Sequence, residues 1–157
     1  MTSDHRRVLV VDDDPEVRRI LAASMRPKSL TVDEAEDGKQ AVALMREHAY
    51  SVIVLDLLMP HVDGFAVLDA IDERSGHASS GHASSGHASS GYDPIVLVVS
   101  GADRHVLDAL DSRRIHGVIR KPFVPQDVAD IVSACAPVPT PSPFATMALA
   151  TMMAGAP

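Results

Sequence analysis

Tryptophan is absent from the 157 residues of this chain, and only two tyrosines and three phenylalanines are present. Aliphatic side chains must therefore form the hydrophobic core. The single cysteine, Cys135, excludes a disulfide within the chain and fits a reducing compartment. No stretch approaches the ~20 apolar residues that a membrane span needs, and the polar segment Met1–Arg7 has no signal-peptide core. We therefore expect a cytoplasmic protein that makes no membrane contact.

Basic residues are also in deficit. Lysine and arginine number 14 against 21 aspartates and glutamates, which gives a formal net charge of −7. A surface that binds nucleic-acid phosphates needs an excess of positive charge, so we expect no nucleic-acid partner. The acidic balance suits a divalent cation or a basic patch on a partner protein better.

Two segments have the composition of chain that stays outside a folded core. Residues 75–91 repeat the pentapeptide Ser-Gly-His-Ala-Ser and are typical of a flexible linker. Residues 136–157 carry alternating prolines and no charge, which favours extended chain over helix. We predict a folded domain over residues 1–135, interrupted by a loop at 75–91, and a disordered C-terminal tail. Alternatively, Phe144–Met153 dock on a partner or on the domain itself.

The rest of the chain alternates strand and helix patterns. Short apolar runs predict strands at 7–11, 30–35, 51–55, 95–99 and 117–119. Apolar residues at helical spacing predict helices that contain Val17–Met25, Ala41–Met45, Phe65–Ile71, Val106–Leu110 and Val128–Cys135. Asp14 suits the N-cap of the first helix, and Asp103 suits the N-cap of the fourth.

The strands are continuous apolar runs, as expected for strands that helices cover on both faces. Five strand–helix pairs of this kind predict an α/β fold with a parallel sheet. Ligands of such sheets bind at the carboxyl ends of the strands. Those ends hold Asp12-Asp13-Asp14, Asp56, Ser100 and Lys121.

Several carboxylates at neighbouring strand ends repel one another unless a cation lies among them. Oxygen ligands without cysteine or histidine favour a hard ion, and Mg²⁺ is the obvious one. A lysine neutralises an added anion, and a serine hydroxyl donates to it. An aspartate, a hard cation, a hydroxyl and an ammonium together suit phosphoryl transfer to a carboxylate.

Four short motifs occur in order, each at a predicted strand end: Val-Val-Asp-Asp, Leu-Asp-Leu-Leu-Met-Pro-His-Val-Asp-Gly, Val-Val-Ser-Gly and Arg-Lys-Pro-Phe. Together they resemble a response-regulator receiver domain of two-component systems, from about Arg6 to Cys135. The resemblance implies a flavodoxin-like, doubly wound sheet of five parallel strands in the order 2-1-3-4-5, with five helices. It also implies a phosphoacceptor signalling protein rather than an enzyme with a substrate of its own.

Carried over residue by residue, the resemblance implies that Asp56 accepts a phosphoryl group from a histidine kinase or phosphotransfer protein. It implies Mg²⁺ ligands at Asp12, Asp13, Asp56 and the backbone carbonyl of Leu58. Ser100 matches the hydroxyl that moves towards the phosphoryl group. Lys121 matches the lysine that pairs with a phosphoryl oxygen, and the Lys121–Pro122 peptide is expected to be cis.

Three positions depart from the family pattern. Val118 replaces a frequent tyrosine or phenylalanine, which argues against an aromatic switch coupled to Ser100. Leu58 and Ala102 flank the expected phosphoryl site, and both are apolar. Because neither side chain can orient an attacking water, we predict slow self-dephosphorylation.

The histidines of the repeat, His77, His82 and His87, are five residues apart and could wrap Zn²⁺ or Ni²⁺. We favour a solvated loop formed by repeat duplication. The repeat joins the third helix to the fourth strand, so the fold places it at the amino ends of the strands, opposite the acidic residues.

We expect a single-domain regulator that signals to an unidentified protein target, as a monomer or a phosphorylation-dependent dimer. Two alternatives remain. Asp12-Asp13-Asp14-Pro15-Glu16 superficially resembles the start of haloacid-dehalogenase-like phosphohydrolases, in which Asp12 would attack and Asp14 would act as acid and base. A degenerate receiver could instead serve only as a docking scaffold.

Overall fold

The computed structural model describes residues 6–59, 64–74, 93–108, 110–111 and 113–136. Five strands form one sheet in this part of the chain: β1 (Arg7–Val11), β2 (Thr31–Ala35), β3 (Val52–Leu55), β4 (Ile95–Ser100) and β5 (Gly117–Arg120). All pairings are parallel, and the order is β2-β1-β3-β4-β5. The predicted five-stranded, doubly wound fold is therefore confirmed.

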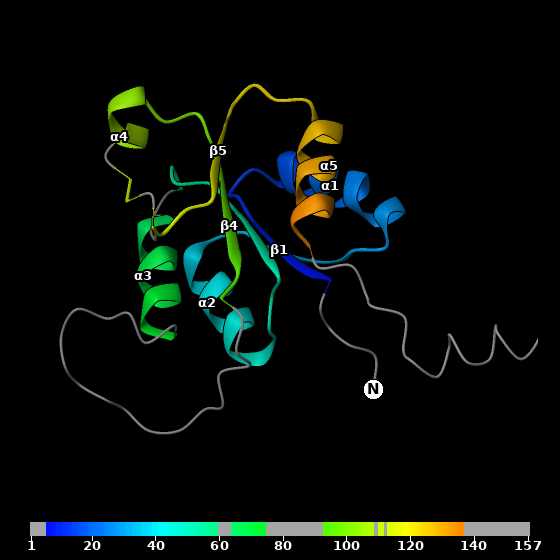
Figure 1. Ribbon diagram of the computed structural model, residues 1–157, viewed down its shortest axis with the longest axis horizontal. Helices are drawn as coiled ribbons and strands as arrows, with labels where there is room; N and C mark the ends of the chain where they lie inside the picture. Colours follow the sequence, from blue (N-terminus) through cyan, green and yellow to red (C-terminus); the bar gives the residue numbers. More distant parts are fainter. Residues whose placement is uncertain (1–5, 60–63, 75–92, 109, 112, 137–157) are drawn as a thin grey trace, which may run out of the picture.

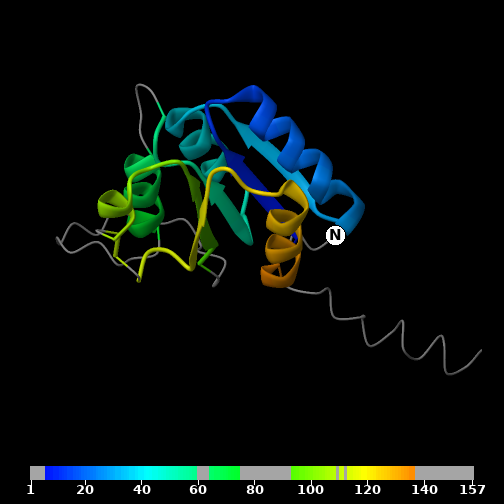
Figure 2. The same cartoon turned by 90° about the horizontal axis from the view of Figure 1, so that it is seen from above.

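Helices cover both faces of the sheet (Figure 1). One face carries α1 (Pro15–Met25) and α5 (Pro125–Cys135), and the other carries α2 (Gly38–Glu47) and α3 (Gly64–Arg74). Figure 2 shows the same two layers from above. A 3-10 turn, η1 (Arg26–Lys28), follows α1, and a short α4 (Arg104–Asp108) precedes β5.

Side-chain caps explain where the first two helices begin. Asp14 accepts a hydrogen bond from the Glu16 N–H at 2.8 Å, and Pro15 occupies the first helical position, where its missing N–H is harmless. Asp37 accepts from the Gln40 N–H at 2.7 Å and caps α2 in the same way. The N-cap predicted at Asp14 is thus confirmed.

The core consists of two apolar clusters, one on each face of the sheet. Leu9, Val11, Ile53 and Leu55 pack towards α2 and α3, while Val8, Val10, Val52 and Val54 pack towards α1 and α5. Every residue of β3 is buried, because this central strand has helices on both faces. The continuous apolar runs of the sequence follow directly from this arrangement.

Some residues of the predicted helical stripes do not enter the core. Ile20, Phe65 and Ile131 are 49%, 37% and 42% exposed, since each lies on the flank of a helix whose buried side is formed by other residues. The fourth helix is shorter than predicted and ends at Asp108. The Leu110 N–H donates to the Leu107 carbonyl at 3.2 Å, three residues earlier, and not to a carbonyl four residues earlier as in an α-helix.

The predicted loop at 75–91, with its three histidines, and the predicted tail at 136–157 lie outside the described residues, apart from Ala136. In the part of the chain that is described, no helix combines the length and apolarity needed to cross a membrane.

His116 extends the pairing of β4 by one position before β5 begins. Its backbone N–H donates to the Val96 carbonyl at 2.8 Å, and its ring Nδ1 accepts from the Val96 N–H at 3.1 Å. Val96 is only 1% exposed while His116 is exposed, so the ring takes the place of water as the acceptor for the Val96 N–H. One imidazole therefore satisfies an otherwise unpaired backbone donor of the core.

We predict that His116→Ala destabilises the protein by about 0.5–1.5 kcal/mol, the usual net contribution of one hydrogen bond, because loss of this exposed side chain lets water reach the Val96 N–H. His116→Asn should recover much of this loss because its side-chain oxygen can accept from the same N–H. Urea denaturation of both variants, with the exposed His105→Ala as control, measures the difference. Equal stability of the alanine and asparagine variants would contradict this role of the ring.

Candidate phosphoacceptor site

The first part of the site is the turn after β1. The Asp12 N–H donates to the Ala35 carbonyl at 3.2 Å, which continues the β1–β2 ladder by one residue. The Asp12 carboxylate accepts from the Asp14 N–H at 2.9 Å and is almost fully buried. Asp13, the next residue, is exposed. One acid is therefore fixed in the protein and its neighbour faces solvent.

Asp56 stands at the end of the neighbouring strand, β3. Its N–H donates to the Val11 carbonyl at 2.8 Å, so the register of β1 and β3 brings it beside the turn at Asp12. Asp56 Oδ1 accepts from the Leu58 N–H at 3.0 Å and from Ser100 Oγ at 2.7 Å. Ser100 is the last residue of β4 and is completely buried.

Lys121, one residue beyond β5, completes the group. Its ammonium donates to Asp12 Oδ2 at 2.6 Å and to Asp56 Oδ2 at 2.8 Å. Its N–H donates to the Ser100 carbonyl at 3.1 Å, and the Lys121–Pro122 peptide is cis, as expected. The ends of four strands thus bring together Asp12, Asp13, Asp56, Ser100 and Lys121.

The electrostatics follow from two buried carboxylates that share one ammonium. Burial raises the pKa of Asp12 above its ordinary value, although the hydrogen bonds from Lys121 and from the Asp14 N–H act in the opposite direction. Burial alone would lower the pKa of Lys121, but its hydrogen bonds and charge interactions with Asp12 and Asp56 outweigh it and raise that pKa. The ammonium therefore stays charged between the two acids.

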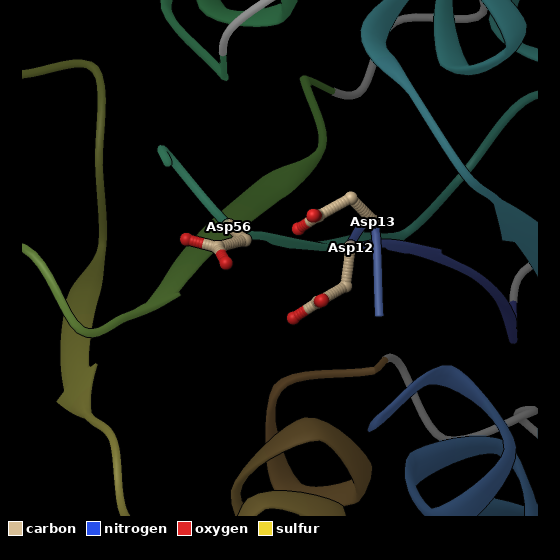
Figure 3. A group of neighbouring side chains, drawn as sticks. All are labelled: Asp12, Asp13 and Asp56. Carbon is tan, nitrogen blue, oxygen red and sulfur yellow. The ribbon is translucent and has the colours of Figure 1, made fainter. Parts of the chain in front are cut away.

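The three aspartates also form a candidate cation site. Asp12, Asp13 and Asp56 each offer a carboxylate oxygen, and these atoms lie within 4.8 Å of one another. Figure 3 shows the three carboxyl groups directed to the same side, beyond the ends of β1 and β3. An all-oxygen donor set at this spacing fits a small hard divalent ion such as Mg²⁺.

The positions that depart from the family pattern differ in their exposure. The Leu58 residue is 54% exposed, whereas Ala102 is buried and its N–H donates to Ser100 Oγ at 3.3 Å. Val118 lies on β5 opposite Val98 and is 39% exposed. The apolar side chains of Leu58 and Ala102 offer no hydrogen bond to a water near Asp56.

Comparisons with known proteins identify the family that this geometry belongs to. The family described as the response regulator receiver domain matches residues 8–133. The chain belongs to this family. Receiver domains are generally phosphoacceptors in signalling rather than enzymes, and the acidic group at the strand ends lies within the matched residues.

Curated relatives are longer than this chain. It is 29% identical over 139 residues to the transcriptional regulatory protein ResD of Bacillus subtilis, covering 84% of this chain and 48% of the relative. It is 28% identical over 127 residues to the transcriptional regulatory protein SrrA of Staphylococcus aureus, covering 81% and 46%. The chain spans about half the length of these two proteins.

Solved structures share the fold. The response regulator TrrA of Thermotoga maritima, in complex with Mg²⁺-BeF, superposes with a TM-score of 0.62 at 22% identity and covers 83% of this chain and 98% of its own. The chemotaxis protein CheY4 of Vibrio cholerae gives a TM-score of 0.65 at 21% identity, with 82% and 97% covered. At these identities the likeness shows the fold of the receiver.

Gly64, the first residue of α3, packs against the backbone at Asp56. A Cβ at Gly64 would lie 2.5 Å from the Asp56 carbonyl oxygen and 2.8 Å from the Leu57 Cα. Only hydrogen fits in this space, so the start of α3 approaches the site more closely than any side chain permits. In the sequence this glycine is the last residue of the motif Leu-Asp-Leu-Leu-Met-Pro-His-Val-Asp-Gly.

Gly64→Ala is expected to destabilise the protein by about 1–3 kcal/mol, because backbone atoms must shift to admit the methyl group. Gly101→Ala is the matched control, since a Cβ there would meet its nearest neighbour, Lys121 Cβ, at an ordinary 4.0 Å. Chemical denaturation compares the two. If both substitutions changed the stability equally, the close contact of Gly64 with the Asp56 backbone would not be the cause of the destabilisation.

Proposed function

We propose that this chain is a response regulator that accepts a phosphoryl group on Asp56 from the phosphohistidine of a sensor kinase or phosphotransfer protein. The observation that carries the proposal is the double engagement of Asp56: Ser100 Oγ holds one carboxylate oxygen and Lys121 Nζ the other. A carboxylate held by a hydroxyl and an ammonium is oriented before any phosphoryl donor arrives.

In the proposed transfer, an Asp56 oxygen attacks phosphorus and forms the new O–P bond. The N–P bond of phosphohistidine breaks, and its electron pair stays on the imidazole nitrogen. Lys121 exchanges its contact with the carboxylate for a contact with a phosphoryl oxygen. The Ser100 hydroxyl donates to the same group. Both residues therefore stabilise the negative charge that the phosphoryl group brings to Asp56.

We propose that Asp12, Asp13, Asp56 and the Leu58 carbonyl hold Mg²⁺ during this reaction. The three carboxylates support this because their oxygens lie within 4.8 Å of one another. When bound, Mg²⁺ supplies positive charge that offsets the charge of the transferred group. Asp12 and Asp56 also keep the ammonium of Lys121 between them at 2.6 and 2.8 Å, so metal and lysine share the acidic group.

We further propose a receiver unit over residues 1–135 with an insertion at 75–91, a tail at 136–157, and output through a protein partner. The net charge of −7 supports a protein partner over direct contact with nucleic acid. Two matched relatives are named transcriptional regulatory proteins, and the match covers only 48% and 46% of their lengths, so output by the whole protein is a separate question from acceptance by the receiver.

The test is phosphorylation of the protein by acetyl phosphate with Mg²⁺, read by intact mass. We expect a gain of one phosphoryl group in the wild type, none in Asp56→Asn, and none after chelation of the metal. Asp14→Asn is the matched control, because it removes a neighbouring carboxylate while asparagine still caps α1. It should gain the phosphoryl group like the wild type.

A phosphoryl gain that persists in Asp56→Asn would assign the acceptor elsewhere. Turnover of a small phosphate ester that survives this substitution would favour the phosphohydrolase alternative, although Asp14 serves as the cap of α1. If the wild type gains nothing and beryllofluoride causes no spectral change, the docking-scaffold alternative replaces the proposal.

We predict slow self-dephosphorylation, because Leu58 and Ala102 offer no side-chain hydrogen bond to an attacking water. Leu58→Asn should speed the loss, since its side chain is exposed and an amide there can orient a water. One hydrogen bond of about 1 kcal/mol corresponds to a rate change of roughly fivefold. Decay of the phosphorylated species, followed by intact mass, measures both rates. A wild-type half-life of seconds would contradict the prediction.

A further inference from the structure

The peptide bond between Asp12 and Asp13 joins two of the three residues whose carboxylates form the candidate cation site. The Asp12 N–H is fixed by its hydrogen bond to the Ala35 carbonyl on β2. The Asp12 carboxylate is fixed by hydrogen bonds from the Asp14 N–H and from the Lys121 ammonium. β1 ends at Val11, and the last ladder hydrogen bond, at Asp12, uses only its N–H. The orientation of the next peptide plane therefore depends on what holds the Asp12 carbonyl. Rotation of this plane would turn Asp13 away from Asp56.

Arg18 of α1 supplies the missing contact. Its Nη1 donates to the Asp12 carbonyl oxygen at 2.6 Å, and its backbone N–H donates to the Asp14 carbonyl at 3.1 Å. The Arg18 side chain is only 13% exposed, and its Nε lies 3.9 Å from Glu34 Oε2 on β2. One arginine thus contacts both ends of the Asp12–Asp14 turn and lies against the neighbouring strand.

We propose that Arg18 is a positioning residue for the metal site: it holds the Asp12–Asp13 peptide so that Asp13 faces Asp56. It does not touch the metal or the phosphoryl group, and it acts only through the Asp12 carbonyl. A charged donor forms a short, strong hydrogen bond with a carbonyl, and a guanidinium buried at one end loses little freedom in forming it. This inference rests on the proposed Mg²⁺-dependent function.

A role of Arg18 through its charge and a role in positioning the turn predict opposite changes in Mg²⁺ affinity when the residue is removed. Arg18 is a cation beside an acidic cluster, so if only its charge acted, its removal would strengthen the binding of Mg²⁺. If it positions the turn, its removal weakens binding, because Asp13 is no longer directed towards Asp56. Loss of a residue that orients metal ligands typically costs about 10–100-fold in affinity.

The experiment compares Arg18→Ala with Arg19→Ala by calorimetric titration of the metal-free protein with MgCl₂. Arg19 is the neighbouring residue and is exposed, and its side chain forms no hydrogen bond or ion pair within the described part of the chain. Both variants lose one positive charge from the same turn of α1. We expect a dissociation constant raised about tenfold or more in Arg18→Ala, and close to the wild-type value in Arg19→Ala.

A second readout needs no metal. The Asp14 N–H donates to the Asp12 carboxylate, so its hydrogen exchange reports whether the turn is formed. We expect faster exchange of this amide in Arg18→Ala and unchanged exchange in Arg19→Ala. If Arg18→Ala does not fold, Arg18→Lys serves in both measurements, because it keeps the charge but is too short to place a donor where Nη1 lies.

Unchanged or tighter Mg²⁺ binding in Arg18→Ala, or wild-type affinity in Arg18→Lys, would overturn the proposal. Unchanged exchange of the Asp14 amide in Arg18→Ala would also overturn it. Failure of the wild type to bind Mg²⁺ is a different outcome: it contradicts the proposed function, while the exchange measurement still decides whether Arg18 holds the turn.

Discussion

The ammonium of Lys121 between Asp12 and Asp56 is the interaction on which the arrangement of the strand ends depends. Two nearly buried carboxylates from adjacent strands would repel each other strongly without a cation. Lys121 provides that cation from β5, two strands away from β3, so its reach requires β4 and β5 to pair in register. The hydrogen bond from the Lys121 N–H to the Ser100 carbonyl fixes where the chain leaves the sheet.

The packing below the site explains why these charges can be held so closely. β3 is buried on both faces, and the strands beside it carry branched aliphatic residues that fill the space to the helices. A strand packed between two layers of helices has little freedom to shift against its neighbours, because a slip would break its close side-chain packing on both faces. Rigid strands therefore present Asp56 and Ser100 at a fixed separation of 2.7 Å between hydrogen-bonded atoms.

The sequence predicted what depends on local pattern. Apolar runs located the strands to within about one residue, and polar residues directly after them located Asp12, Asp56, Ser100 and Lys121. It could not show that Ile20 lies on the exposed flank of α1, because spacing alone does not say which edge of a stripe the sheet covers. It also missed Arg18, since a contact between a side chain and the Asp12 carbonyl depends on how α1 crosses the sheet.

The hydrogen bonds of the site also suggest how acceptance on Asp56 would reach the surface. Ser100 and Lys121 are both engaged with the carboxylate, so a phosphoryl group there must redirect their donors. Ser100 ends β4, and Lys121 follows β5, the edge strand on which Val118 is exposed. Under the proposed function, the change at the site is therefore transmitted to these two strands first. Since Val118 has no aromatic ring to reorient, the signal must travel through the backbone and through Ser100 rather than through a ring flip.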